Sequence, residues 1–210
     1  MPYELDPALP LDEPVNKRQR YESRFGADRV AAMEEQMRSH GREYGIEFNY
    51  DGTVRGTLLS HRLMHRALEQ GGWTAQKKLL EVLFPYYFEK AGDPGDPEQL
   101  GRIGAEAGLF DDAKQGTEWL TKTHEAEPEV KAGISLAKQK GITGVPHFEI
   151  VAGGDPDEPG DVAAGKKLVK AEIPGAQEPD TFVAVFRQLA EAYKKANGEG
   201  VAPVPAGAKC

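Results

Sequence analysis

Residues 141 to 150, Gly-Ile-Thr-Gly-Val-Pro-His-Phe-Glu-Ile, constrain the fold more than any other stretch of the chain. Two turn glycines precede a Val-Pro step and a short strand-like run. Proline fixes φ and has no N–H to donate, so Pro146 can open a strand or lie at an edge but cannot occupy the middle of a ladder. We therefore predict that a strand begins at Pro146.

An X-Pro bond is also the place where a cis peptide costs least. A cis bond before Pro146 would expose the backbone of Val145, whose N–H and C=O could then bind a ligand. The alternative is an ordinary trans proline at the start of a strand. Cis bonds make up only about 5–6% of X-Pro bonds in folded proteins, which favours the trans alternative when the residues are considered alone.

The Gly144-Val145-Pro146 step, after a charged helix and before a hairpin, resembles the cis-proline loop of thioredoxin-fold proteins. Further segments resemble the FrnE-like branch of the DsbA family, over roughly residues 3 to 193. These segments are Tyr3-Glu4-Leu5-Asp6-Pro7, Ser60-His61-Arg62-Leu63, Leu83-Phe84 with Tyr87-Phe88, Gly95-Asp96-Pro97, Ala107-Gly108-Leu109 and Gly175-Ala176-Gln177.

The resemblance implies an α/β fold, thioredoxin-like and of the DsbA type, with a large helical insertion. It also implies thiol-disulfide oxidoreductase activity and a cis Val145-Pro146 bond. Gly144, Val145 and Pro146 would bind the substrate, which would be a protein or a small thiol.

The family's chemistry depends on a Cys-x-x-Cys pair at the start of the first helix, where the helix N-terminus lowers the thiol pKa. This sequence contains one cysteine, Cys210. We therefore expect no catalytic residue in the chain and no disulfide reductase activity. Compared with the family, the first strand, the catalytic helix and most of the second strand are expected to be missing, so the fold would be N-terminally truncated.

Three functions remain open. The first is an oxidoreductase-family protein that is inactive or incomplete as this chain. The second is a relative of glutathione-dependent transferases and isomerases, which need no Cys-x-x-Cys. The third is a non-catalytic module that holds peptides with the Val145 backbone edge and a helical groove.

Charge and composition exclude other partners. The net charge of −8 and the acidic pI of about 5.2 argue against a nucleic-acid surface, which needs a basic patch. No apolar run reaches the roughly 18 residues of a membrane span, and no secretory signal is recognisable at the N-terminus. The near-absence of cysteine fits a reducing compartment, so we predict a cytoplasmic protein. Self-association is expected, because a missing first strand would leave the strand after Pro146 with an open edge.

We predict four segments: an extended arm over residues 1–16, a helical insertion over 17–140, the C-terminal thioredoxin-like half over 141–196, and a disordered tail over 197–210. Within the insertion, helices are expected to break near Gly26 and Pro128, and Asp96 is expected to cap a helix. Pro85 should either kink a helix or mark its first turn. Residues 79–88 should be core. An acidic loop at 153–160 should lead to a partner strand at 168–173, and a final helix should start near Pro179.

No metal or cofactor site is expected. His61 and His65 have the spacing of a helical metal pair, but no third ligand is apparent. The pairs Asp111-Asp112 and Asp155/Asp157 are more typical of solvated turns than of calcium sites. The chain also lacks a phosphate-binding glycine loop and a serine-nucleophile motif.

Overall fold

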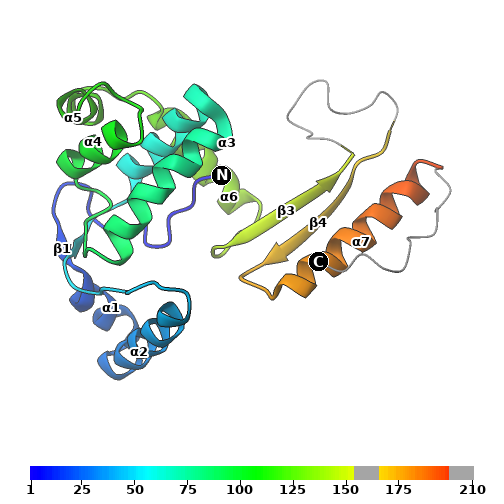
Figure 1. Cartoon of the computed structure of the whole chain (residues 1–210), viewed down its shortest axis with the longest axis horizontal. Helices are drawn as coiled ribbons and strands as arrows, with labels where there is room; N and C mark the ends of the chain where they lie inside the picture. The colour runs from blue at the N-terminus through cyan, green and yellow to red at the C-terminus, as the bar shows by residue number, and fades with distance from the viewer. Residues whose placement is uncertain (154–165, 199–210) are drawn as a thin grey trace. The chain divides into compact units, whose positions relative to one another are not determined.

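The computed structural model describes residues 1–153 and 166–198 (Figure 1). The chain divides into two compact units, Met1–Gly141 and a second that begins at Ile142, and each is described by itself. The predicted tail from residue 199 to Cys210 and most of the predicted acidic loop lie outside the described residues. No helix in the described part of the chain combines the length and the apolar character that crossing a membrane requires.

The first unit is mainly helical. Its elements are β1 (Val15–Asn16), α1 (Lys17–Phe25), α2 (Ala27–Glu43), β2 (Thr53–Val54), α3 (Leu58–Phe88), α4 (Pro97–Glu106), α5 (Ala113–Lys122) and α6 (Glu127–Gln139). The two short strands pair antiparallel, with Val15 opposite Val54. This pairing ties the extended N-terminal arm to the segment that leads into α3.

Local sequence signals set several helix ends. Asn16 caps α1 by accepting from the Gln19 N–H, and Asp96 caps α4 by accepting from two N–H groups of its first turn, as predicted. Gly26 separates α1 from α2 with a φ of 86°, a conformation that glycine adopts without a steric penalty. Residues 46–50 form an irregular segment between α2 and β2.

Helix α3 is broken at a place that was not predicted. Pro85 lies inside the helix with helical dihedral angles, so the alternative that it marks the first turn of a helix is wrong. The non-helical residues are Gly71 and Gly72, and Gly72 has a φ of 60° and a ψ of −152°. A glycine pair bends at lower cost than any other dipeptide, because neither residue has a Cβ.

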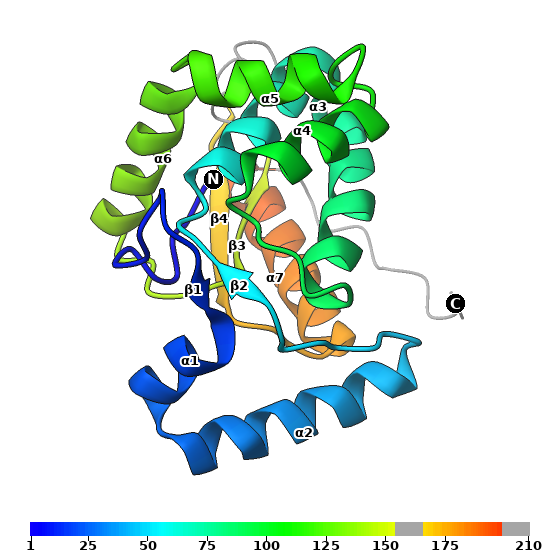
Figure 2. The ribbon, with the colours of Figure 1, turned by 90° about the vertical axis from the view of Figure 1, so that its left-hand side faces the viewer.

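The core of the first unit lies between α3, α4 and α5. Figures 1 and 2 show α4 and α5 side by side, with α4 against α3. The fully buried members of the core are Leu63, Ala67, Leu79 and Leu100. A separate small cluster of Leu58, Val130 and Ile134 joins α6 to the start of α3.

Two glycines bring α4 and α5 into backbone contact. A Cβ on Gly101 would lie 2.6 Å from the Thr117 backbone nitrogen and 2.7 Å from the Ala113 oxygen. A Cβ on Gly116 would lie 2.7 Å from the Gly101 oxygen. All three distances are too short for real Cβ contacts, so this helix pair can form only without side chains at these two positions.

The second unit is a β-hairpin with a helix. Strands β3 (His147–Ala152) and β4 (Val169–Pro174) pair antiparallel, with Phe148 opposite Ile173, and helix α7 spans Pro179–Ala196. Helix α7 covers the face that carries Phe148, whose ring packs edge-on against Phe182 at 5.0 Å. The predicted strands and final helix are thus confirmed. In the described residues, β3 pairs only with β4.

Candidate functional site

The Val145-Pro146 peptide bond is cis, as predicted from the resemblance. The carbonyl oxygen of Pro146 accepts a hydrogen bond from the Gly175 N–H at 2.8 Å, which fixes the loop to the end of β4. The β3 ladder begins at the next residue, His147. The loop is therefore held in place by the hairpin that follows it.

Val145 presents its backbone to solvent. Its exposed fraction is 49%, and within the described ranges its N–H and C=O make no hydrogen bond. A free donor and acceptor at the start of a strand can pair with an extended polypeptide. Gly144 has open space where a Cβ would stand, so the loop leaves room for such a ligand. The assignment of Gly144, Val145 and Pro146 as binding residues remains a prediction.

A cavity in the first unit has a volume of about 880 Å³. Apolar side chains of α2 and α3 line it, among them Met33, Met37, Phe84 and Phe88. Phe84 is half exposed, so the prediction that residues 79–88 are all core is wrong for this side of the helix. Leu79 and Leu83 on the other side are buried. One face of this apolar helix segment is therefore buried in the core, and the other face lines the cavity.

Polar side chains also line this cavity, among them Tyr21, Glu34 and Tyr87. The buried Glu34 carboxylate contacts Arg18 at 2.8 Å and Arg38 at 3.5 Å. Its Oε1 atom has no hydrogen-bond partner in the part of the chain that the structure describes. The hydroxyls of Tyr21 and Tyr87 lie 3.2 Å apart, and burial raises the pKa of Tyr87 well above its usual range.

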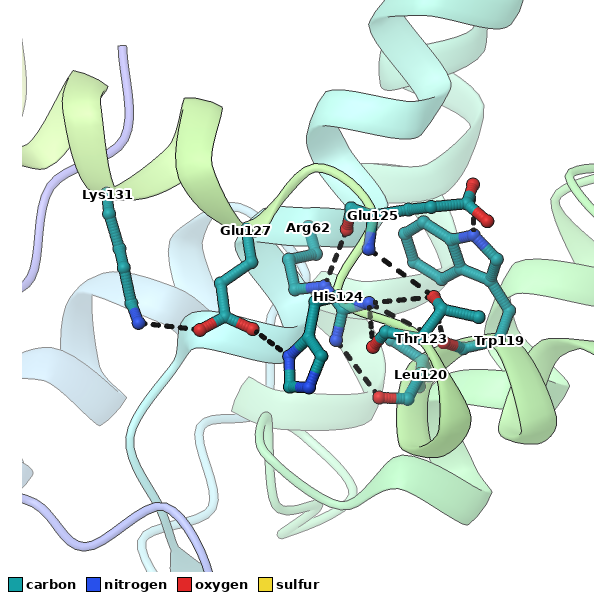
Figure 3. A network of polar contacts seen from close by, with 8 residues as sticks. All are labelled: Arg62, Trp119, Leu120, Thr123, His124, Glu125, Glu127 and Lys131. Atoms are coloured by element: carbon teal, nitrogen blue, oxygen red, sulfur yellow. Dashed lines mark hydrogen bonds and ion pairs between the residues drawn. The ribbon is translucent and has the colours of Figure 1, made fainter.

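Arg62 is the most deeply enclosed charged side chain near α5 (Figure 3). Its guanidinium donates to the backbone oxygens of Leu120 at 3.0 Å, Thr123 at 2.9 Å and Glu125 at 2.9 Å. The last carbonyls of a helix have no partner within the helix, and a cation there also complements the helix dipole. Arg62 therefore closes the end of α5. Burial lowers the pKa of the Arg62 guanidinium.

A second group of charges surrounds the start of α6 (Figure 3). Glu127 accepts from Lys131 at 2.6 Å and lies 2.8 Å from the His124 ring nitrogen. These two hydrogen bonds lower the pKa of Glu127 to about 2. Next to them, Trp119 donates its indole N–H to the Glu125 carboxylate at 2.9 Å. Each of these polar side chains has a hydrogen-bond partner, which is typical of a structural junction.

The earlier metal candidates have other partners. The His61 ring lies 2.8 Å from the Thr57 oxygen, and His65 lies 3.5 Å from Glu69. Asp112 caps α5 by accepting from the Gln115 N–H. Across residues 1–153 and 166–198, neither candidate gains the further ligands that would complete a metal site. The pair Asp155/Asp157 lies outside the described residues.

A family model for the DSBA-like thioredoxin domain matches residues 1–187. The chain belongs to the DSBA-like thioredoxin domain family. Its structure is similar to the crystal structure of a probable DsbA oxidoreductase from Streptomyces coelicolor, with a TM-score of 0.63 and 23% sequence identity. That similarity covers 99% of this chain and 78% of the other. A search of curated proteins gave no match.

Both comparisons agree with the α/β thioredoxin fold that the resemblance implies. The DSBA-like chain departs from the family's chemistry in its cysteine content, which is a single residue. The chain therefore has a cis-proline loop, and its sequence contains no pair of cysteines.

Sequence reasoning found the cis-proline loop of this DSBA-like protein but missed several other features of the two units. The cavity was signalled only by Met33 and Met37, which are i, i+4 neighbours on α2. The function of Arg62 could not be read from its own helix, because its acceptors lie about 60 residues later. His147 and Glu172 lie 3.8 Å apart on neighbouring strands, and the hairpin register could have indicated this pair.

Proposed function

We propose that this chain binds a cysteine-containing polypeptide or a small thiol at Gly144, Val145 and Pro146, within the thiol-disulfide chemistry of the DSBA-like family. The observation that carries the proposal is the cis Val145-Pro146 bond next to a Val145 backbone that is exposed and has no hydrogen bond among the described residues. An extended segment of the substrate would pair with that backbone, and this pairing would hold its sulfur atom near the loop.

The chain by itself does not complete a disulfide exchange in this proposal. Exchange starts with attack of a thiolate on a disulfide sulfur, and release of the mixed disulfide requires a second thiol. Cys210 is the one cysteine of the sequence and cannot form an intramolecular disulfide. The role of the chain is therefore to hold the substrate, and the thiols come from the substrate or from another molecule. A reducing compartment such as the cytoplasm would supply small thiols.

Backbone NMR spectroscopy of the full chain tests the binding site. An extended peptide with one cysteine is titrated, together with the same peptide carrying serine and with glutathione. We expect the largest shift changes at residues 144–147. Val145→Pro removes the N–H donor and should weaken binding at least tenfold, whereas Val145→Ala keeps the donor and should bind within about twofold of the original chain.

The outcomes separate the candidate functions. Equal binding of the cysteine and serine peptides at the loop would contradict the thiol preference and favour a non-catalytic peptide module. Binding of glutathione alone would favour the transferase and isomerase relatives. Shift changes that avoid residues 144–147 would overturn the loop as the binding site.

The cavity of the first unit supports the peptide-binding module as a second candidate function. Exposed apolar side chains that line a concave surface are typical of sites for amphipathic helices or other apolar ligands. Met37→Glu places a charge among those side chains and should abolish binding of an amphipathic helical peptide. Val145→Pro should leave that binding unchanged, so the two surfaces can be tested independently.

A further inference from the structure

Three side chains with metal-binding atoms converge on one side of the β3-β4 hairpin. They are His147, Glu149 and Glu172, and one ligand atom from each lies within 4.8 Å of the others. His147 Nε2 and Glu172 Oε2 are 3.8 Å apart. This distance is too long for a hydrogen bond. Two ligands of a tetrahedral zinc ion lie roughly 3.3 Å apart, given ligand distances of about 2.0–2.1 Å.

The strands determine this arrangement. His147 and Glu149 are two residues apart on β3, so their side chains project from the same face. Glu172 lies directly opposite Glu149 in the antiparallel register, and it therefore shares that face. The opposite face carries Phe148 and Ile173 and packs against α7. The three ligands thus stand on a scaffold that the apolar face of the hairpin holds in shape.

The donor set indicates the class of ion. One imidazole nitrogen and two carboxylate oxygens form a mixed N/O set, which suits zinc and other borderline divalent ions better than magnesium or calcium. Two carboxylates also neutralise a dication. His147 is largely enclosed, with 15% of its side chain exposed, whereas Glu172 is open to solvent. An ion would therefore reach the site from the side of the carboxylates.

We propose that His147, Glu149 and Glu172 bind one Zn²⁺ ion, with water as the remaining ligand. The proposal revises the expectation of no metal site, and it does not depend on the proposed function of the loop. His147 directly follows Pro146, so the bound ion would lie next to the exposed Val145 backbone and could also contact a substrate thiolate there. Thiolate is among the ligands that zinc prefers.

Isothermal titration of the full chain with ZnCl₂ tests the site, with Cys210→Ser as the background so that the tail thiol cannot contribute. We expect one ion per chain. His147→Gln and Glu172→Gln should each weaken binding at least tenfold. His40→Gln is the matched control, because His40 and Glu43 form an exposed pair at 3.6 Å that lacks a third ligand in the described residues. That variant should leave the affinity within twofold.

A second measurement does not rely on variants. Co²⁺ added to the background chain should broaden the amide resonances of 147–149 and 170–173 before all others, because paramagnetic broadening falls steeply with distance. Equal weakening by His40→Gln and His147→Gln, or broadening centred on another part of the chain, would overturn the proposal. The absence of saturable binding at one equivalent would overturn it as well.

Discussion

The Arg62 guanidinium donates from Nη2 to the backbone oxygen of Thr123 at 2.9 Å, although the two residues are 61 positions apart in the sequence. The same guanidinium also bonds the oxygens of Leu120 and Glu125. One side chain from the first turns of α3 therefore supplies the donors that the end of α5 lacks. It also fixes the path of the chain toward α6.

Replacement of Arg62 should be among the most destabilising changes in the first unit. Arg62→Met leaves several buried carbonyl groups without donors, and we expect a loss of about 3 kcal/mol in the free energy of unfolding. Arg62→Lys should recover only part of this loss, because an ammonium group does not have the planar fork that reaches all acceptors. Urea unfolding measures both. Arg42→Lys, on the exposed end of α2, should change stability by less than about 0.5 kcal/mol. A stable Arg62→Met variant would contradict this account.

The Glu127 network should appear in the acid range of the stability profile. The ordinary pKa of this carboxyl is 4.5, and the hydrogen bonds from Lys131 and His124 lower it to about 2 in the folded protein. The unfolded state therefore binds the proton more tightly. The contribution of the network is fully present above pH 4.5 and is lost as the pH falls from 4.5 toward 2.

Glu127→Gln tests this pH dependence. Both partners of Glu127 are largely exposed, so the loss near neutral pH should be only about 1 kcal/mol. The difference between the variant and the original chain should shrink as the pH falls through the acid range. Glu129→Gln controls for the helix dipole, because Glu129 also lies in the first turn of α6. A difference that stays constant with pH would rule out titration of Glu127 as its cause.

Asp93 should be essential for the junction between β2 and α4. Its buried carboxylate accepts from the backbone N–H groups of Arg55 at 3.1 Å and Gly95 at 2.9 Å, and it contacts the Arg55 guanidinium at 3.1 Å. Asp93→Ala leaves these donors buried without an acceptor, so we expect a loss of about 3 kcal/mol. Thermal unfolding followed by circular dichroism measures it. Asp111→Ala, at an exposed turn, should lower the melting temperature far less, and equal effects would argue against a special role for Asp93.

The chain should not catalyse disulfide reduction. Insulin reduction by dithiothreitol should proceed at the same rate with and without the protein, because Cys210 has no second cysteine in the sequence. A rate well above background that survives Cys210→Ser would contradict both this prediction and the role proposed for the chain.

The second unit should promote self-association. Strand β3 pairs only with β4 in the described residues, and on α7 the side chains of Val183 and Phe186 are 42% and 51% exposed. An open strand edge beside exposed apolar groups favours contact between copies. Light scattering coupled to size exclusion should show species larger than a monomer. Phe186→Lys should shift them toward the monomer, whereas Arg187→Lys should not. A monodisperse monomer of the original chain would refute the prediction.

The elements that could be predicted are those with local signals. The Asp96 side chain caps the start of α4, and the positive φ of Gly26 ends α1. The cis bond before Pro146 was predicted from the resemblance of the neighbouring residues to the family's loop. The break in α3 at Gly71 and Gly72 was not predicted, although a glycine pair is a local signal for a bend.

The elements that could not be predicted depend on residues far apart in sequence. No periodicity near Arg62 indicates which carbonyl groups it will meet. The exposure of Phe84 depends on where α2 lies, since an apolar side chain has the same sequence pattern in a core and in a cavity. The proximity of His147 and Glu172 could be recognised only from the register of the hairpin.

The contact between Gly101 and Gly116 has a consequence for evolution. Contacts are often inferred from compensating changes, in which one residue grows while its neighbour shrinks. Here each position already has the smallest possible residue, and a larger one at either site meets backbone atoms that no second substitution can remove. Related sequences should therefore keep both glycines together, and this close approach between two helices would leave no trace of covariation.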